Sequence, residues 1–161
     1  MSTVAIVLLV VGVLGVVAVI GIGIMSVLAI YGTRKYLAEA KRAEGKNGAM
    51  MLARGIAQCS EESGVLPASS HKVPASMSAV QGKKYMSTPS DWSGDKAFAC
   101  AHFSMSMPQY FQYEWQLLGP GKGVARATAD LDGDGVADPA IEIEVTCAGP
   151  GACKAGTLPA P

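Results

Sequence analysis

Four aspartates lie close together in the stretch DLDGDGVAD, residues 130–138. The pattern DxDxDGxxD matches the first part of a helix-loop-helix calcium site, in which alternate acidic side chains turn their oxygens toward one centre. The ninth position of such a loop supplies a further acid, and the seventh supplies a main-chain carbonyl. The sequence therefore predicts calcium as a cofactor, with these ligands: Asp130, Asp132, Asp134, the carbonyl of Val136, and Asp138.

A simple turn between two strands is the alternative interpretation, because Asp-Gly pairs are strong hairpin signals. A complete calcium loop ends in a bidentate Glu at position twelve, where this chain has Ile141. Glu142 can replace that ligand only with a shifted geometry. Four acids at this spacing repel one another unless a cation is present, which favours calcium at modest affinity.

The four cysteines are the second set with defined chemistry. Cys147 and Cys153 bracket the short loop AGPGA, which predicts a local disulfide, and Cys59 and Cys100 would then form the other. Four cysteines allow three pairings, and their spacing alone does not choose among them. Metal binding is the alternative, but CxxC spacing is missing and the two histidines are isolated. We expect disulfides, and hence an oxidising compartment.

Other candidate chemistry is weak. Ser, His and Asp residues show no nucleophile-elbow spacing, with His71 in an expected loop and His102 on an expected strand. The stretch GPGKG at 119–123 resembles a phosphate loop only superficially, because no helix follows it. The formal net charge is zero, without the basic footprint of nucleic-acid-binding proteins. We expect neither an enzyme nor a nucleic-acid-binding protein.

Residues 4–30 carry no charged side chain, and a basic, helix-forming stretch follows them without a turn signal. A helix of about 27 residues is about 40 Å long, more than the roughly 30 Å that a bilayer core requires. A cleaved signal peptide is the alternative, but it would need a basic start, a shorter apolar run and a small-residue cleavage site. We expect a retained helix, placed in a membrane or in a filament core.

Small residues recur every third position along this helix, at Gly12, Gly15, Ala18 and Gly21. Such a stripe lets helices approach closely in lipid, so it predicts the surface for self-assembly. The alternative is that Gly is simply frequent in membrane helices.

The helix is expected to run from about residue 3 to residue 62. Leu52, Ile56 and Cys59 recur on one face, which predicts that this face is buried. Gly45 and Gly48 weaken the middle of the helix by about 1 kcal/mol each relative to Ala, which makes a bend there plausible.

The last third of the chain changes from helical to strand periodicity, with a loop-like region before it. Alternating apolar and polar residues and Gly-Pro or Asp-Gly turns predict four consecutive antiparallel strands with one wet face, near 97–105, 110–118, 124–129 and 141–145. The expected fold is α+β, a long helix packed on this sheet. Its parts are an apolar helix (1–33), an amphipathic continuation (34–64), a globular domain (65–147) and an irregular tail (148–161).

The segment GIMSVLAIYGTRKYLAEAKRAEGKN resembles the type IV pilin segment that runs from a glycine through Ala-Ile-Pro-Tyr to Ala-Lys and Glu-Gly. The matching positions are Gly23-Ile24, Ala29-Ile30, Tyr36, Ala40-Lys41 and Glu44-Gly45. The later stretches GKKYMSTPSDW, FACAHFSMSMPQYFQYEW and DLDGDGV are similar to a pilin-like group of myxobacterial-type Gram-negative bacteria. The resemblance is specific over about residues 22–136.

This resemblance implies a structural subunit of a type IV pilus-like extracellular filament, which assembles with copies of itself through the apolar helix. It implies a place in the bacterial inner membrane with a periplasmic domain, or in the extracellular filament, or both, and pilus or secretion assembly proteins as partners. Some pseudopilins of type II secretion hold calcium in a loop near the C-terminus, which agrees with the aspartate motif.

The chain also departs from the pilin pattern. The leader with Phe-Thr-Leu-Ile-Glu is missing, Leu14 stands where the resemblance places the assembly glutamate, and Tyr31 replaces the helix-kinking proline. These departures predict the alternative: an uncleaved single-pass inner-membrane protein whose periplasmic, calcium-binding domain docks onto a pilus or secretion machine. Basic residues after the apolar run would favour a cytoplasmic domain, whereas the cysteines favour export, which we expect.

Overall fold

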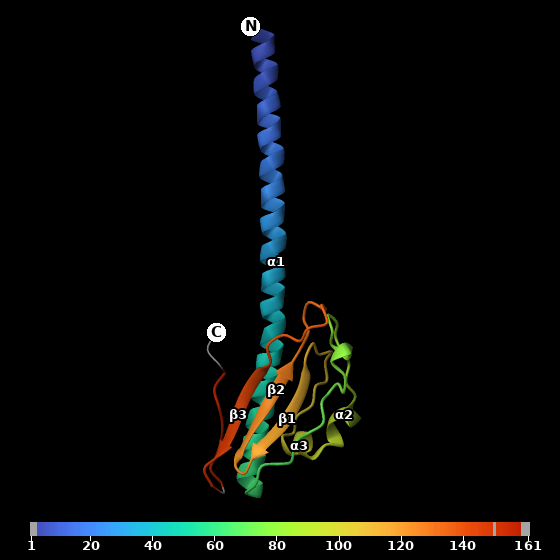
Figure 1. The fold of residues 1–161 in the computed structure, drawn as a ribbon, viewed down its shortest axis with the longest axis vertical. Helices are drawn as coiled ribbons and strands as arrows, with labels where there is room; N and C mark the ends of the chain where they lie inside the picture. Colours follow the sequence, from blue (N-terminus) through green and yellow to red (C-terminus); the bar gives the residue numbers. More distant parts are fainter. Residues whose placement is uncertain (1–2, 150, 159–161) are drawn as a thin grey trace. The chain divides into compact units, whose positions relative to one another are not determined.

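The computed structural model describes residues 3–149 and 151–158, and the chain divides into two compact units, Met1–Glu39 and Ala40–Pro161. A single helix, α1, spans Thr3–Ser63, in agreement with the predicted range (Figure 1). The other elements are the 3-10 helix η1 (Met77–Ala79), α2 (Pro89–Ser93), α3 (Lys96–Cys100), β1 (Gln112–Gly119), β2 (Lys122–Thr128), β3 (Ile141–Cys147) and β4 (Cys153–Ala155). The fold is α+β, as predicted.

The first unit contains the apolar part of α1. Its segment Val11–Ala29 has the length and composition that a membrane span and a signal sequence share. The hydroxyls of Ser26 and Thr33 each donate to the carbonyl one turn back, at 2.8 and 3.1 Å. The described side chains of Val11–Ala29 present an exposed surface on which Ser26 is the one polar residue, and its hydroxyl bonds within the helix.

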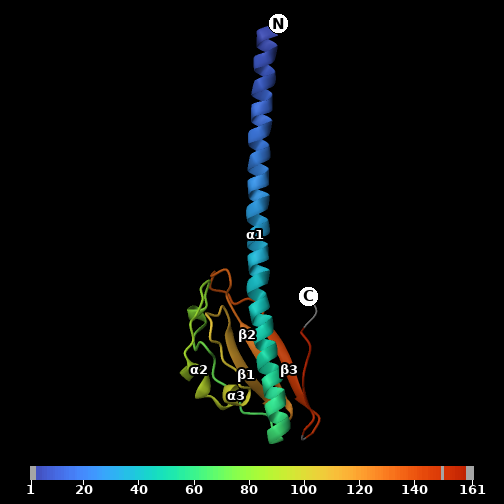
Figure 2. The same ribbon diagram turned by 180° about the vertical axis from the view of Figure 1, so that it is seen from behind.

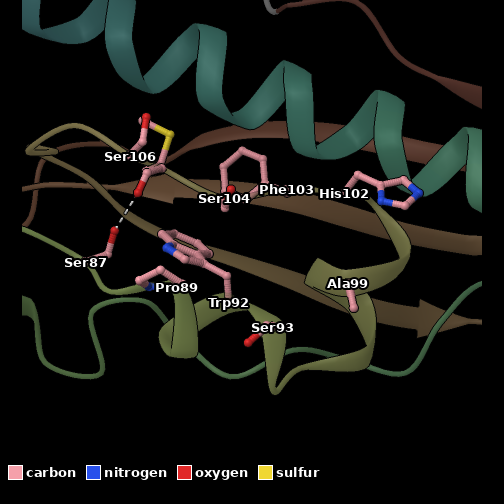
Figure 3. Close-up of a pocket in the computed structure, with 10 residues that line it drawn as sticks. Ser87, Pro89, Trp92, Ser93, Ala99, His102, Phe103, Ser104 and Ser106 are labelled. Carbon is pink, nitrogen blue, oxygen red and sulfur yellow. Dashed lines mark hydrogen bonds between the residues drawn. The ribbon is translucent and has the colours of Figure 1, made fainter.

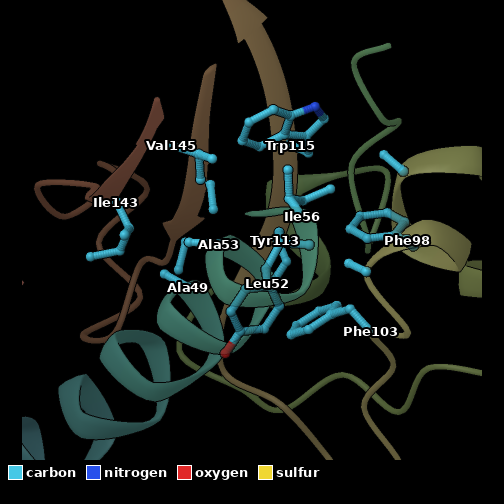
Figure 4. Close-up of a cluster of buried hydrophobic side chains, with 14 of the residues drawn as sticks. Ala49, Leu52, Ala53, Ile56, Phe98, Phe103, Tyr113, Trp115, Ile143 and Val145 are labelled. Atoms are coloured by element: carbon cyan, nitrogen blue, oxygen red, sulfur yellow. The ribbon is translucent and has the colours of Figure 1, made fainter. Parts of the chain in front are cut away.

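In the second unit, the C-terminal part of α1 lies across one face of the sheet (Figures 1 and 2). Buried side chains recur at three- and four-residue spacing along it, which is the period of one helix face. They are Ala49, Leu52, Ala53, Ile56 and Ala57. Leu52 and Ile56 lie among aromatic rings that include Phe98 and Tyr113 (Figure 4). The face predicted from Leu52 and Ile56 is therefore the one that is buried.

Three glycines of α1 lie where the helix approaches its neighbours most closely. A Cβ on Gly45 would lie 2.5 Å from the Cε1 atom of the Phe111 ring. A Cβ on Gly48 would overlap the Tyr113 ring, and one on Gly55 would overlap the carbonyl oxygen of Ala101. From the sequence, Gly45 and Gly48 are expected only to lower the stability of the helix. In the structure, the lack of a side chain at these positions lets aromatic rings pack directly against the helix.

The sheet has the order β1-β2-β3-β4, and every neighbouring pair is antiparallel. Trp115 pairs with Ala125, which pairs in turn with Ile143, and all three are fully buried. Small residues on β2 thus lie between large residues on its neighbours, on the face that packs against α1. On the opposite face Arg126 donates to Glu114 and Glu142, at 3.2 and 2.7 Å. This is the predicted alternation.

The prediction of a strand over residues 97–105 is wrong. The chain forms the helix α3 over Lys96–Cys100, and the described residues 101–111 between it and β1 form no strand. The Asp95 carboxylate caps this helix by accepting from the amides of Ala97 and Phe98, at 2.8 and 3.3 Å. The helix ends at Cys100, and His102 follows the C-cap residue Ala101 with a left-handed φ of +49°. The Phe103 amide then donates to the Phe98 carbonyl, as in a helix C-terminal cap. His102 therefore lies in a helix cap and not on a strand.

The fourth strand lies instead in the tail that we predicted to be irregular. β4 pairs with β3 in the register Cys147 to Cys153, and these two residues also form a disulfide with a Cα–Cα distance of 3.9 Å. The second disulfide joins Cys59 of α1 to Cys100 of α3, with a Cα–Cα distance of 5.6 Å. Both bonds join the partners that the sequence predicts. The covalent link beside the Gly-Pro-Gly loop holds a short strand that has no periodicity of its own.

Candidate functional site

The loop between β2 and β3 brings three of the predicted metal ligands together. The carboxylates of Asp130, Asp132 and Asp134 each offer an oxygen, and these oxygens lie within 4.8 Å of one another. Asp130 is buried, while the other two side chains are exposed. Oxygen ligands grouped in this way, partly in a protein wall and partly open to solvent, can hold a hard divalent cation.

Asp130 is the fixed centre of this loop. Its two carboxylate oxygens accept hydrogen bonds from the amides of Gly133 and Gly135, at 2.7 and 2.9 Å. Both glycines have left-handed backbone conformations, with φ of +79° and +91°, which other residues adopt only with strain. The main chain therefore curls around one carboxylate. A carboxylate has about four lone-pair positions, so acceptor capacity remains for a cation.

The two exposed acids repeat this turn on a smaller scale. Asp132 accepts from the amide of Asp134 at 3.3 Å, and Asp134 accepts from the amide of Val136 at 2.7 Å. Each aspartate therefore bonds the main chain two residues on, as Asx turns do. The alternate spacing noted in the sequence has this local origin. A ligand role for the Val136 carbonyl stays a prediction.

Asp138 lies outside the group of three carboxylates. One of its oxygens accepts from the Arg42 guanidinium at 3.3 Å, and the other accepts from the Leu131 amide at 2.9 Å. Its own amide donates to the Ala129 carbonyl at 2.7 Å and closes the neck of the loop. The structure thus gives Asp138 a positioning role, whereas the motif predicts a ninth-position ligand. The difference arises from Arg42, which only the tertiary fold brings near.

Residues distant in sequence hold the loop from outside. The Lys41 ammonium of α1 donates to the Leu131 carbonyl at 3.2 Å, and the Gln81 amide donates to the Gly133 carbonyl at 3.3 Å. The Gly82 amide donates to the Asp130 carbonyl at 2.7 Å. Sequence reasoning missed these contacts because none of the three residues carries a motif. They fix the loop against α1 and the 81–82 segment.

Lys41 also belongs to a second charged cluster beside the helix. Its ammonium and that of Lys84 lie 4.7 and 5.0 Å from the centroid of the Tyr110 ring. The amide of Tyr110 donates to the Glu44 carboxylate at 2.7 Å. Burial raises the pKa of the Glu44 carboxyl above its ordinary value, while the Tyr110 amide and the Lys84 charge oppose that shift.

The small-residue stripe predicted for self-assembly lies entirely in the first unit. A Cβ added at Gly12, Gly15 or Gly21 would meet no heavy atom within 4 Å, outside the nearby helix backbone and the adjacent residues. Ala18 is likewise exposed. The stripe is therefore open along the helix and has room for another helix.

The imidazole of His71 contacts two other segments of the chain. The imidazole of His71 lies 2.9 Å from an Asp95 carboxylate oxygen through Nδ1, and 2.9 Å from the Asp91 carbonyl oxygen through Nε2. It therefore joins the loop before η1 to α2 and α3.

Comparison of the chain with protein-family models, curated proteins and solved structures gives no match.

Proposed function

We propose that this protein is a structural subunit of a type IV pilus-like extracellular filament, which assembles with copies of itself through the apolar part of α1. One observation carries the proposal: α1 is a single helix that packs on a sheet after Ala40 but presents an exposed apolar surface over Val11–Ala29. Apolar surface of this extent is stable only when lipid or another protein surface covers it. A filament core of identical helices provides such cover.

The open stripe of Gly12, Gly15, Ala18 and Gly21 supports helix-to-helix contact, because small residues allow backbones to approach closely. The Cys59–Cys100 and Cys147–Cys153 disulfides support a globular unit in an oxidising compartment. The protein would then pass from the bacterial inner membrane, with its second unit in the periplasm, into the filament. Pilus or secretion assembly proteins would be its partners during that step.

The loop between β2 and β3 would hold calcium in this proposal. Calcium takes six to eight oxygen ligands in flexible geometry. Asp130, Asp132 and Asp134 supply carboxylates, the two exposed acids leave positions for water, and Asp138 keeps its bond to Arg42. Cation binding would stabilise the connection between two core strands in an extracellular, calcium-rich medium.

A second candidate is a single-pass inner-membrane protein whose periplasmic domain docks onto a pilus or secretion machine. The observation that favours it is the absence of any acidic side chain from residues 4–30, where the resemblance places Leu14 at the assembly glutamate. The hydroxyls of Ser26 and Thr33 bond within their own helix. Lipid would cover the apolar surface of such a helix as well as other copies of the helix would.

Electron microscopy of native material, with mass spectrometry of the N-terminus, separates the two candidates. We expect filaments from the wild type, and we expect Gly15→Leu to remove them because Leu blocks close approach of helices. Val13→Leu is the matched control, since Val13 is already 54% exposed and lies on the side of the helix opposite Gly15. Membrane-bound material without filaments in the wild type would support the second candidate, and filaments from Gly15→Leu would reject the stripe.

A further inference from the structure

A cleft of about 570 Å³ lies beside α2 and α3, away from the aspartate loop. Its volume falls within the range of about 300–1,000 Å³ typical of small-molecule sites. Its apolar lining includes the half-buried Met105 and the almost fully buried rings of Trp92 and Phe103, and Ser93, Ser104 and His102 contribute exposed polar groups. The described lining contains no Asp, Glu, Lys or Arg side chain. The chemistry of the cleft is therefore that of a neutral ligand with both apolar and hydroxyl surface.

A residue that lines this cleft carries a buried hydrogen-bond donor without an acceptor among the described residues. Trp92 is 2% exposed, and its indole nitrogen Nε1 bonds to no acceptor among the described residues. The indole packs edge-on against the Phe98 ring, at a centroid distance of 5.0 Å. It also packs edge-on against the Phe103 ring, at 5.3 Å (Figure 3). An unsatisfied buried donor costs about 1–3 kcal/mol, so a group that supplies an oxygen acceptor here is stabilised. The indole nitrogen has almost no accessible surface, so a ligand contacts it only if the lining of the cleft moves outward.

His102 gives a second, independent sign of a site. Among the described non-glycine residues it alone has a positive φ, +49°, at a helix-cap position where glycine is the usual residue. A left-handed non-glycine residue costs about 1–2 kcal/mol. Its imidazole is exposed and lines the cleft. Backbone strain at a residue that faces a cleft is a recurrent property of ligand sites.

The hydroxyl of Ser87 is already engaged, since it donates to the Met105 carbonyl at 2.9 Å (Figure 3). The exposed hydroxyls of Ser93, Ser104 and Ser106 remain at the rim and can each donate or accept. We propose that this cleft binds a neutral sugar ring. The ring's hydroxyls would meet Ser104, His102 and the Trp92 N–H, and its C–H face would lie on the apolar side.

The test follows the two tryptophan indole N–H signals of the full chain by NMR, with ¹⁵N-labelled Trp in a detergent without a sugar headgroup. Trp92→Phe assigns the signals. Methyl α-glucoside, methyl β-galactoside and N-acetylglucosamine are titrated separately. We expect a saturable shift of the Trp92 signal with at least one of them. Trp115 is the internal control, because its indole already donates to the Pro67 carbonyl at 3.0 Å.

His102→Gly keeps the left-handed backbone without strain, so we expect it to fold at least as stably as the wild type. It should bind the sugar about fivefold more weakly, the loss of one ordinary hydrogen bond. Ser104→Ala, at an exposed position, should weaken binding similarly. The proposal is overturned if no sugar shifts the Trp92 signal, if cyclohexanol shifts it equally, or if both variants bind like the wild type.

Discussion

Gly48 of α1 lies directly beneath the ring of Tyr113 on β1, so close that a single methyl group at position 48 would overlap the ring. Tyr113 is fully buried, and its hydroxyl donates to the Glu44 carbonyl one turn earlier in the same helix, at 3.4 Å. This contact sets how near the helix lies to the sheet, and a residue that weakens an isolated helix is the one that allows the packing.

Gly48→Ala should therefore destabilise the protein, although helix propensity alone predicts a gain of about 1 kcal/mol. Overpacking a filled core costs about 1–3 kcal/mol, because the buried ring and its backbone must shift. Urea denaturation followed by circular dichroism measures the change. Asn47→Ala, at the exposed neighbouring position, is the control and should stabilise slightly. A Gly48→Ala variant more stable than the wild type would contradict the packing described here.

Calcium should raise the melting temperature of the wild type, because it binds only the folded loop. The gain is about 2.7 kcal/mol at a hundredfold excess over the dissociation constant. Replacing both Asp132 and Asp134 with Asn should abolish the shift. Asp138→Asn should lower stability without calcium, through its bonds to Arg42 and Leu131, yet keep a calcium-dependent rise. If calcium at millimolar concentration leaves the wild type unchanged, the loop is only a turn.

Glu44→Gln should stabilise the protein near neutral pH. Burial raises the pKa of Glu44 in the folded state, so the ionised carboxyl opposes folding and stability is lost as the pH rises through that pKa. Gln keeps an oxygen for the Tyr110 amide without the charge. Below about pH 3, where Glu is protonated in both states, the advantage should vanish.

Denaturation of Glu44→Gln at both pH values measures this difference, with Glu61→Gln as the control at an exposed position of α1. A gain for Glu44→Gln that is equal at both pH values would mean that charge burial is not its cause.

The two disulfides should contribute unequally. The Cys59–Cys100 bond closes a loop with a sequence separation of 41, and the Cys147–Cys153 bond closes one with a separation of 6. In the chain-entropy model the long loop is worth about 4 kcal/mol and the short loop about 2 kcal/mol. Double Cys→Ser variants compared by thermal unfolding test the order, and non-reducing peptide mapping tests the pairing. Crossed pairs or free thiols in the mapping would contradict both.

The sequence by itself determined features whose cause is local. The uncharged run and the helix-forming stretch that follows it without a turn signal predict the extent of α1, and the repeat of Leu52 and Ile56 predicts which face is buried. The alternate acids from Asp130 to Asp134 predict a turn that gathers carboxylates, since each aspartate bonds a main-chain amide a few residues later. The short AGPGA loop likewise favours the pairing of Cys147 with Cys153.

Only the tertiary structure decided what depends on distant neighbours. The short run near Phe98 fits a strand or a helix by periodicity, and the Asp95 cap with the Cys59–Cys100 bond accompanies the helix that forms. Asp138 bonds to Arg42, 96 residues away in the chain, and lies outside the cluster of the other three carboxylates. A side chain is excluded at Gly48 because the Tyr113 ring, distant in sequence, packs against this position. Local spacing fixes backbone conformation, whereas close packing and charge pairing join residues that spacing cannot relate.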